Sequence, residues 1–280
     1  MTDLLPASAQ AHLIDLPGGR FRYLTWSAEE TNRPDMLLLH GITSSALSWA
    51  RVGPALADRY RVFALDMRGH GKSVQSPPGT YSLRRTADDA AELIAALGLD
   101  NPVVIGHSWG GATAMVLASG AWSEQPVPAL ARVILEDPAY AFGRGDVEAR
   151  TAFYTRDIGR PAKELRPELA ASSPGWTEAD IEGKIEALQQ VTKTAVLSVF
   201  EEAGQAGDIL SLLARIAAPT LLMRADANLD TTMDAAAWAR AQGYLTSSSR
   251  GVEIPGATHN IHRSKFDAFM QVVNDYLAEK

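Results

Sequence analysis

The sequence predicts an α/β protein: a mainly parallel sheet of eight strands that helices cover on both faces. Two observations support this class. Short apolar runs that suit buried strands alternate with helical stretches along most of the 280 residues. One segment, from about residue 139 to 209, breaks the alternation because it contains no convincing strand. We therefore expect an α/β core built from residues 1–138 and 210–280, with a helical cap inserted as residues 139–209.

The elements of the expected core follow in order along the chain. Residues 12–16 and 21–26 flank a Pro-Gly-Gly turn, which favours an opening hairpin. The other strands are short apolar runs, as expected for parallel strands buried on both faces. These runs are residues 36–39, 61–65, 103–105, 132–135, 220–223 and 251–254. Helices are expected at residues 46–57, with a break at Gly53-Pro54, and at residues 82–97, 112–119, 233–241 and 265–278.

The expected cap consists of helical stretches separated by polar breaks. Residues 177–180, Thr-Glu-Ala-Asp, resemble a capping box with Asp in place of the usual Glu, so a helix should begin there. A binding crevice is expected beneath the cap, at the carboxyl ends of the strands. We name Trp109, Tyr140, Phe153 and Trp176 as candidate substrate-binding residues, although packing of cap on core is the simpler explanation for any single one of them.

Composition suits a globular protein and excludes several functions. Apolar residues make up 46% of the chain and charged residues 21%. The net charge of −7 argues against nonspecific binding of nucleic acid, which needs a basic surface. The absence of cysteine excludes disulfides and thiolate metal sites. No signal segment is evident and no run approaches the ~18 apolar residues of a membrane span, so we expect a cytoplasmic protein without a membrane partner. The sequence does not indicate whether it is a monomer or a homodimer.

The strongest functional motif is G-x-S-x-G at residues 106–110, Gly-His-Ser-Trp-Gly. It follows an apolar strand and precedes small and apolar residues that suit a helix. A serine hydroxyl is a weak nucleophile unless a sharp turn lifts it from its strand toward a base, and the glycines leave room for that turn. We expect Ser108 to be a nucleophile. The alternative is an ordinary strand-to-helix turn that carries a serine.

A nucleophilic serine needs a base and donors for an oxyanion. His259 follows the last expected strand in a loop that could bring its imidazole over the crevice, whereas a loop histidine in isolation is usually a solvated surface residue. His262 raises the possibility of a metal site with His259, but no third ligand of suitable spacing is evident. We therefore expect no metal and no cofactor. The backbone N–H groups of Ile42 and Trp109 are the expected oxyanion donors.

Together these motifs resemble the α/β-hydrolase superfamily over nearly the whole chain. His40-Gly41, with Trp49 downstream, resembles its oxyanion segment, and residues 66–73 resemble its D-x-R-G-x-G-x-S turn. The histidine loop resembles that of the family with Thr258 in place of the usual glycine. The turn also mimics the end of a phosphate-binding loop, but Asp66 stands where that loop needs glycine. The resemblance makes His70 a structural turn residue.

The acid is where the chain departs from the family pattern. After the seventh strand, the usual G-x-x-D stretch is Ala-Asp-Ala-Asn, so Asn228 occupies the usual acid position. Some relatives, among them dehalogenases and certain lactonases, carry the acid at the end of the sixth strand. Asp137 stands there, although an aspartate before proline is also a common turn former. We expect Asp137 to be the acid, with Asp226 as the alternative, since Glu136 should point to the opposite face of the strand.

These residues predict a serine hydrolase that cleaves a small carboxylic ester or lactone through an acyl-enzyme on Ser108. Serine at the turn, rather than aspartate, argues against the dehalogenases and epoxide hydrolases that share this fold. Two alternatives stay open. One is a carbon–carbon bond hydrolase of the same fold, and the other is a small-molecule receptor with vestigial hydrolase activity, as plant hormone receptors of this fold exemplify.

Overall fold

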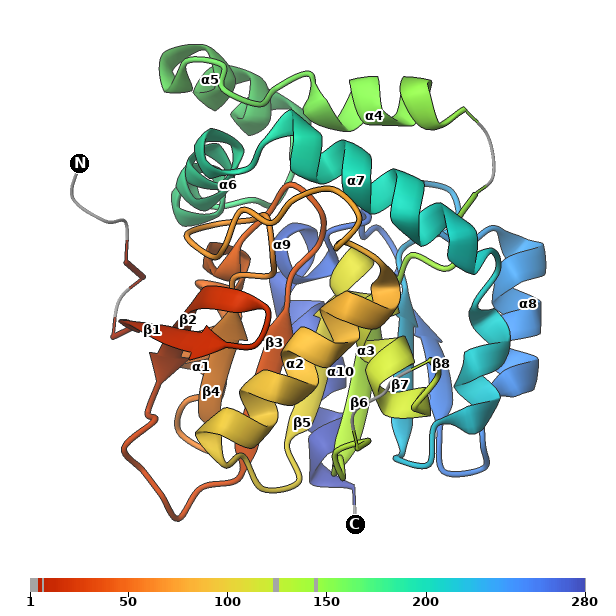
Figure 1. Ribbon diagram of the computed structural model, residues 1–280. Helices are drawn as coiled ribbons and strands as arrows, with labels where there is room; N and C mark the ends of the chain where they lie inside the picture. The colour runs from red at the N-terminus through yellow and green to blue at the C-terminus, as the bar shows by residue number, and fades with distance from the viewer. Residues whose placement is uncertain (1–4, 7, 123–125, 144–145, 280) are drawn as a thin grey trace.

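An eight-stranded sheet forms the centre of the computed structural model, which describes residues 5, 6, 8–122, 126–143 and 146–279 (Figure 1). Its strand order is β1-β2-β4-β3-β5-β6-β7-β8. β2 pairs antiparallel with β1 and β4, and every other pair of neighbours is parallel. The expected α/β class and the mainly parallel sheet are thus confirmed. The strands are β1 (Gln10–Leu16), β2 (Gly19–Trp26), β3 (Asp35–Leu39), β4 (Arg61–Leu65), β5 (Val103–His107), β6 (Arg132–Glu136), β7 (Thr220–Arg224) and β8 (Arg250–Glu253).

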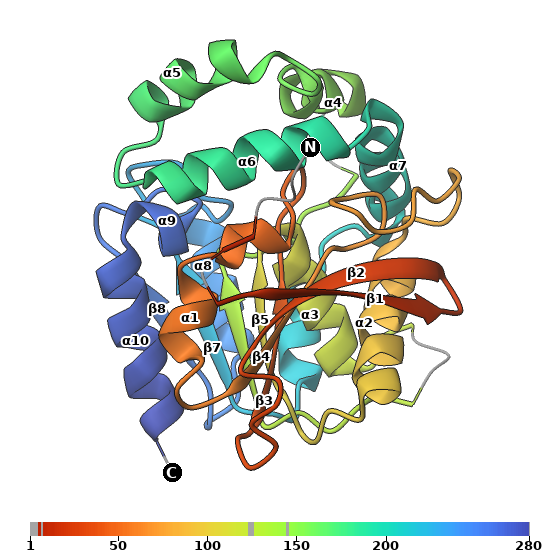
Figure 2. The ribbon, with the colours of Figure 1, turned by 90° about the vertical axis from the view of Figure 1, so that its left-hand side faces the viewer.

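Helices cover both faces of the sheet because successive strand residues point to opposite sides. In β3, Leu37 and Leu39 pack into one apolar cluster with α2, α3 and α8, whereas Met36 and Leu38 pack into the other with α1 and α10. Figure 2 shows these two layers on either side of the strands. The core helices are α1 (Val52–Leu56), α2 (Leu83–Leu97), α3 (Trp109–Ser119), α8 (Ala235–Tyr244), α9 (Ile261–Ser264) and α10 (Phe266–Ala278), with 3-10 turns η1 (Ala46–Trp49) and η3 (Leu210–Arg215).

Several helix boundaries differ from expectation. The expected break at Gly53-Pro54 is wrong: the interruption falls between η1 and α1, and Pro54 lies in the first turn of α1. Proline is tolerated there because a first-turn residue has no intrahelical partner for its N–H. α3 begins at Trp109, three residues before the expected start, because it follows directly from the turn at Ser108. α8 begins two residues late, where the Asp234 side chain caps it by accepting the N–H of Ala237 at 2.7 Å.

Four helices between β6 and β7 lie across the carboxyl ends of the strands (Figures 1 and 2). They are α4 (Val147–Thr155), α5 (Ala162–Ser172), α6 (Glu178–Gln190) and α7 (Lys193–Ala203), and the 3-10 turn η2 (Gly204–Ala206) follows. We call α4 to α7 the helical insert. The expected capping box at the start of α6 is present: the Thr177 hydroxyl accepts the N–H of Asp180, and the Asp180 carboxylate accepts the N–H of Thr177.

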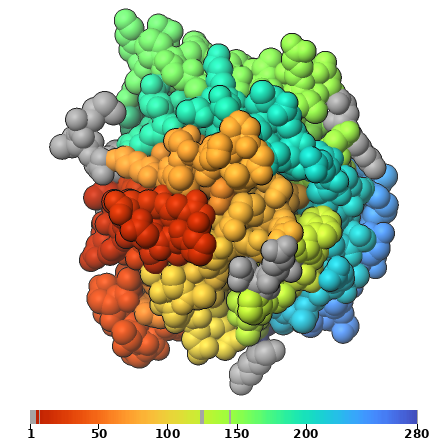
Figure 3. Space-filling view, viewed as in Figure 1, coloured from red at the N-terminus to blue at the C-terminus, as the bar shows by residue number. Residues whose placement is uncertain are grey.

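The helical insert sits directly on the core. Figure 3 shows the surface of α7 (teal) meeting the loop that follows β4 (orange). Hydrogen bonds hold this contact, because the Glu202 carboxylate accepts the backbone N–H groups of Gly79 (2.7 Å) and Tyr81 (2.5 Å). On the other side, Asp180 of α6 forms ion pairs with Arg51 at 3.4 Å and Arg263 at 3.8 Å. The insert therefore covers the sheet edge at which a site is expected.

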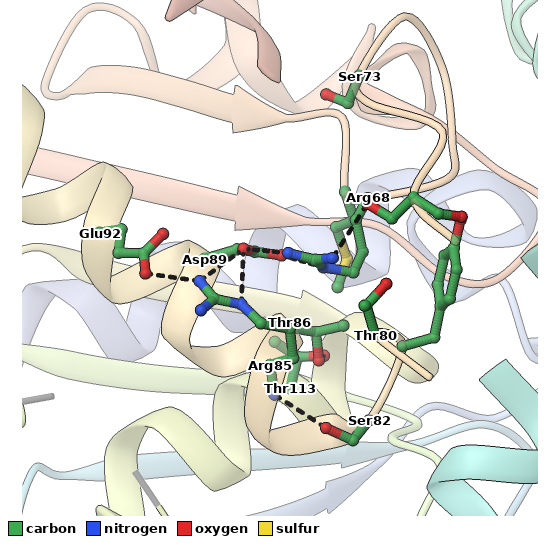
Figure 4. A network of polar contacts seen from close by, with 12 residues as sticks. Arg68, Ser73, Thr80, Ser82, Arg85, Thr86, Asp89, Glu92 and Thr113 are labelled. Carbon is green, nitrogen blue, oxygen red and sulfur yellow. Dashed lines mark hydrogen bonds and ion pairs between the residues drawn. The ribbon is translucent and has the colours of Figure 1, made fainter. Parts of the chain in front are cut away.

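A buried charge network fixes the turn after β4 against α2 (Figure 4). Arg68 donates to both carboxylate oxygens of Asp89, at 2.5 and 2.6 Å. Arg85 also donates to Asp89, at 2.9 Å, and to Glu92, at 2.6 Å. Bidentate arginine–carboxylate pairs satisfy charges that burial would otherwise penalise. The turn is thus held in one position beneath the helical insert.

Candidate active site

Ser108 occupies a strained turn between β5 and α3. Its φ is 53° and its ψ −115°, a conformation that costs a non-glycine residue roughly 1–3 kcal/mol. The flanking glycines allow the turn: a Cβ on Gly106 would lie 2.3 Å from the carbonyl oxygen of Gly110, and a Cβ on Gly110 would lie 2.2 Å from that of Leu39. As expected, these glycines leave the room that the turn needs. The turn presents the serine hydroxyl at the carboxyl edge of the sheet.

Three sequence-predicted residues meet at this edge. His259 Nε2 lies 2.9 Å from Ser108 Oγ, and His259 Nδ1 lies 2.6 Å from Asp137 Oδ2. Ser108 follows β5, Asp137 follows β6 and His259 follows β8, so parallel strands bring together residues up to 151 positions apart. In this geometry Nδ1–H donates to the carboxylate and Nε2 accepts the serine proton, which is the tautomer that a general base requires.

The Asp137 carboxylate is fully buried and every described contact it makes is with a donor. Its Oδ1 accepts the hydroxyl of Thr231 at 2.7 Å and the N–H of Ala225 at 3.3 Å. Its Oδ2 accepts the N–H of Thr232 at 3.0 Å, in addition to the His259 ring. A buried carboxylate is tolerated when such hydrogen bonds replace its hydration. These contacts hold the Asp137 carboxylate in place behind the imidazole.

The electrostatic environment makes His259 a stronger base than an ordinary histidine. Burial alone would lower the pKa of its imidazole, but the hydrogen bond and the negative charge of Asp137 outweigh burial, so the pKa is raised. The side chain of His259 is 15% exposed. This histidine can take up a proton from a neighbouring hydroxyl and hold it as an imidazolium.

Asp226, the alternative acid, lies in a different network. Its Oδ2 accepts the N–H of Gly256 at 2.7 Å, and its Oδ1 accepts the N–H and side-chain amide of Asn228 at 2.9 and 3.1 Å. These donors lower the pKa of its carboxyl, with Gly256 the largest contributor. Asp226 therefore fastens the turn after β7 to the histidine loop. The structure does not bring it to His259 Nδ1, which Asp137 occupies.

The two expected oxyanion donors flank the serine. Gly41, which precedes Ile42, packs so closely that a Cβ there would lie 3.2 Å from Ser108 Cβ. Trp109 is the first residue of α3, where N–H groups have no intrahelical partner. Within the described part of the chain, neither the Ile42 nor the Trp109 N–H donates to a protein acceptor. Both are therefore available to a developing oxyanion.

Two buried side chains hold the loop that contains Ile42. His40 accepts the N–H of Met67 at Nε2 (3.0 Å), and its Nδ1 lies 2.8 Å from the carbonyl oxygen of Gly41. Burial lowers the pKa of His40 to about 4, so the ring is neutral and can accept at Nε2. Asp66 accepts the N–H of Ala46 at 2.7 Å, which ties the end of the same loop to the turn after β4.

The candidate substrate-binding residues lie in different surroundings. Trp109 and Tyr140 are buried in one apolar cluster, with the Trp109 ring 5.0 Å from the ring of His70. Trp176 lies against the guanidinium of Arg263, 4.4 Å from its ring centre. Phe153 is 58% exposed on α4, so its position does not support a place in a pocket. The direction of a side chain on the insert depends on tertiary packing, which one sequence does not reveal.

Sequence reasoning missed the partner of His262. Its backbone N–H and its Nδ1 lie 2.9 and 2.8 Å from Glu136 Oε1, and its ring stacks on Trp49 with 4.6 Å between centres. As expected, Glu136 points away from the face that Asp137 serves. The sequence did contain a signal for this pair. Two adjacent acids, Glu136 and Asp137, follow one another at a strand end, and two histidines, His259 and His262, lie three residues apart in one loop. Within the described residues, no group of three His, Asp or Glu side chains could hold a metal.

A mainly parallel α/β sheet that carries a hydrogen-bonded serine, histidine and aspartate at its carboxyl edge defines the class of protein as a hydrolase. The family comparison agrees, since a model described as alpha/beta hydrolase fold matches residues 34–265. The chain belongs to this family, and the resemblance drawn from its motifs is confirmed. None of the described helices has the length and apolar character needed to cross a membrane.

Individual relatives differ in how much of the chain they match. N-formylmaleamate deformylase of Pseudomonas putida is 29% identical over 190 residues, which cover 67% of this chain and 69% of the relative. A soluble epoxide hydrolase of Corynebacterium sp. is 38% identical over 107 residues, only 38% of this chain and 36% of that one. The crystal structure of E-2-(acetamidomethylene)succinate hydrolase superposes with a TM-score of 0.80 at 19% identity, covering 97% of this chain and all of that one, which shows a shared fold.

Proposed function

We propose that this protein is a serine hydrolase that cleaves a small carboxylic ester or lactone through an acyl-enzyme on Ser108. The observation that carries the proposal is the continuous hydrogen-bonded path from Ser108 Oγ to His259 Nε2 (2.9 Å) and from His259 Nδ1 to Asp137 Oδ2 (2.6 Å). Such a path lets a serine lose its proton as its oxygen attacks. The raised pKa of His259 supports the role of base.

The reaction proceeds in two halves. Ser108 Oγ attacks the carbonyl carbon while His259 Nε2 takes its proton, and the N–H groups of Ile42 and Trp109 bind the oxyanion. The imidazolium, stabilised by Asp137, returns the proton to the leaving alkoxide as the ester bond breaks. A water molecule then loses a proton to His259 and attacks the acyl carbon, which releases the carboxylic acid and restores Ser108. No cofactor takes part in these steps.

The proposal extends to domain organisation. Residues 1–138 and 210–280 form the catalytic core, and residues 139–209 form a cap whose four helices cover Ser108. In a lactone the alkoxide and the acyl group belong to one molecule, so the cap would hold a single hydroxy acid until release. A cap that excludes water before acylation also strengthens the electrostatic interactions within the site.

The relatives favour one further candidate, removal of a formyl group, because the relative that spans two thirds of the chain is named a deformylase. The chemistry of attack by Ser108 is the same for both candidates. The epoxide hydrolase relative carries less weight, because it shares only 38% of the chain and serine replaces the aspartate that such enzymes use at the turn. Carbon–carbon bond hydrolysis and a receptor role are the remaining alternatives.

The test is a screen of activated short-chain esters, lactones, N-formyl amides and carbon–carbon bond substrates. We expect the wild type to turn over an ester or lactone many times and Ser108→Ala to lower kcat by about 10⁴-fold or more. Ser119→Ala, which alters the buried serine at the other end of α3, is the matched control and should keep the wild-type rate. A fluorophosphonate should add one mass increment to the wild type and none to Ser108→Ala. A single slow turnover with tight ligand binding would instead indicate a receptor.

A further inference from the structure

Lys184 connects the helical insert to the loop that contains Ile42. It lies on α6, and its ammonium donates to the carbonyl oxygen and to the hydroxyl of Thr43, both at 2.8 Å. Thr43 directly follows Ile42, whose N–H is an expected oxyanion donor. Lys184 is only partly buried. The ammonium thus lies against the residue that follows Ile42, with two neutral oxygens as its described partners.

The charges around Lys184 do not balance. Among the described residues, no carboxylate lies within ion-pair distance of its ammonium. Nearby, the single carboxylate of Asp180 pairs with both Arg51 and Arg263. The Arg263 side chain is 2% exposed, and its Nε and Nη2 atoms have no hydrogen-bond partner. Two arginines therefore share one carboxylate where α6 meets the core, and Lys184 has no described carboxylate partner there. Buried or partly buried cations are costly without counter-charges.

The titration of Lys184 reflects the same imbalance. Burial and the charge of Arg263 lower the pKa of its ammonium to about 7. Asp157 is the acid that opposes this shift, but it already pairs with Arg156 at 3.2 Å and Arg160 at 2.8 Å. An anion bound at Lys184 would stabilise the charged form of its ammonium. The neutral oxygens of Thr43 cannot supply that compensation.

We propose that Lys184 binds a carboxylate of the substrate, so that the preferred substrate is a short ester or lactone with a second, ionised carboxyl group. This inference rests on the proposed hydrolase function and names its substrate class. Gly41 packs against Ser108, and Thr43 is two residues further, a span of at most about 7 Å. The free carboxylate therefore lies a few bonds from the carbonyl that is attacked. Half-esters of four- to six-carbon dicarboxylic acids fit this spacing.

A purely structural role predicts a different result. If Lys184 only fastens α6 to Thr43, its loss displaces the loop and weakens catalysis for every substrate alike. If it binds a carboxylate, its loss weakens catalysis selectively for anionic substrates, mainly through KM. The informative quantity is therefore the ratio of kcat/KM for two substrates that differ only in that charge.

The experiment compares 4-nitrophenyl hydrogen glutarate with its methyl ester in four proteins. These are the wild type, Lys184→Gln, which keeps a donor toward Thr43 without the charge, Lys184→Arg, which keeps the charge, and Lys163→Gln, which removes an exposed lysine of α5. We expect the anionic-to-neutral ratio to fall by about 10- to 100-fold in Lys184→Gln, the loss expected for one charged hydrogen bond. Lys184→Arg should keep most of the preference, and Lys163→Gln all of it.

An unchanged ratio in Lys184→Gln, or equal losses for both substrates, overturns the inference. A binding measurement separates this outcome from failure of the proposed function. Glutarate is titrated calorimetrically into the wild type and Lys184→Gln, with thermal unfolding as a check that both are folded. Binding that only the wild type shows supports the carboxylate site even if no ester is hydrolysed. Equal binding by both proteins, or binding by neither, contradicts it.

Discussion

Two carboxylate–imidazole pairs lie at the end of β6, one on each face of the strand. In the outer pair Asp137 holds His259, whose other ring nitrogen reaches Ser108. In the inner pair Glu136 holds His262, whose Nε2 is buried without a described partner. His107 separates the two imidazoles, with its ring centre 4.7 Å from that of His259 and 5.2 Å from that of His262. The pairs use the same chemical groups at adjacent positions.

The surroundings, rather than the pairing, decide which histidine can act as a base. Burial and then the charge of Arg263 hold the pKa of His262 well below its ordinary value, even though Glu136 contacts the ring. Burial also opposes protonation of His259, but there the contribution of Asp137 outweighs it and the pKa is raised. Burial raises the pKa of the Glu136 carboxyl as well, so it disfavours the negative charge that would stabilise an imidazolium at His262. A carboxylate neighbour alone therefore does not make a general base.

The largest expected effect comes from neutralising the outer acid. Asp137→Asn should lower kcat on an activated ester by about 10³- to 10⁴-fold, because an amide at this position favours the wrong imidazole tautomer and cannot stabilise the imidazolium. Asp226→Asn, the matched substitution in the neighbouring network, should cost less than about tenfold. Steady-state kinetics measure both variants. The reverse ranking would show that Asp226 is the acid.

Neutralising the inner acid should affect stability more than turnover. Glu136→Gln removes the charge from a buried hydrogen-bonded pair, so we expect the free energy of unfolding to fall by about 1–3 kcal/mol. The kcat should fall less than about tenfold, since the described hydrogen bonds of the Glu136 carboxylate go to His262 and not to Ser108 or His259. Urea denaturation and steady-state assays give the two values. If Glu136→Gln matched Asp137→Asn in kcat without loss of stability, the distinction between the pairs would be wrong.

The smallest expected effect is a shift in the pH dependence of activity, which distinguishes the two pairs. A general base must be neutral to accept the serine proton, so kcat/KM should rise with pH through the raised pKa of His259. Asp137→Asn removes the interaction that raises this pKa, and the acidic limb of the profile should move to lower pH. In Glu136→Gln the limb should move far less, because Asp137 contributes most of the upward shift. If the acidic limb moved in Glu136→Gln but not in Asp137→Asn, this account would be wrong.

Much of the core could be predicted from the sequence because its elements are local patterns. The strand β4 has the expected bounds, and the other strands differ by one or two residues. Counting along β6 placed Asp137 at the sheet edge, since the carboxyl ends of parallel strands share that edge. The Glu136–His262 pair was missed because it depends on how the histidine loop turns after β8. The contact between Lys184 and Thr43 was equally hidden, because it joins segments 141 positions apart.

The position of the acid at the end of β6 has a consequence for how this chain can change by mutation. If Asp137 is the acid, as proposed, the loop after β7 supports it through hydrogen bonds, because Thr231 and Thr232 donate to its carboxylate. Several residue types can provide such hydrogen bonds. The exposed tip around Asn228 is therefore free to accept substitutions and insertions. New substrate contacts could evolve at that rim without disturbing the catalytic charge.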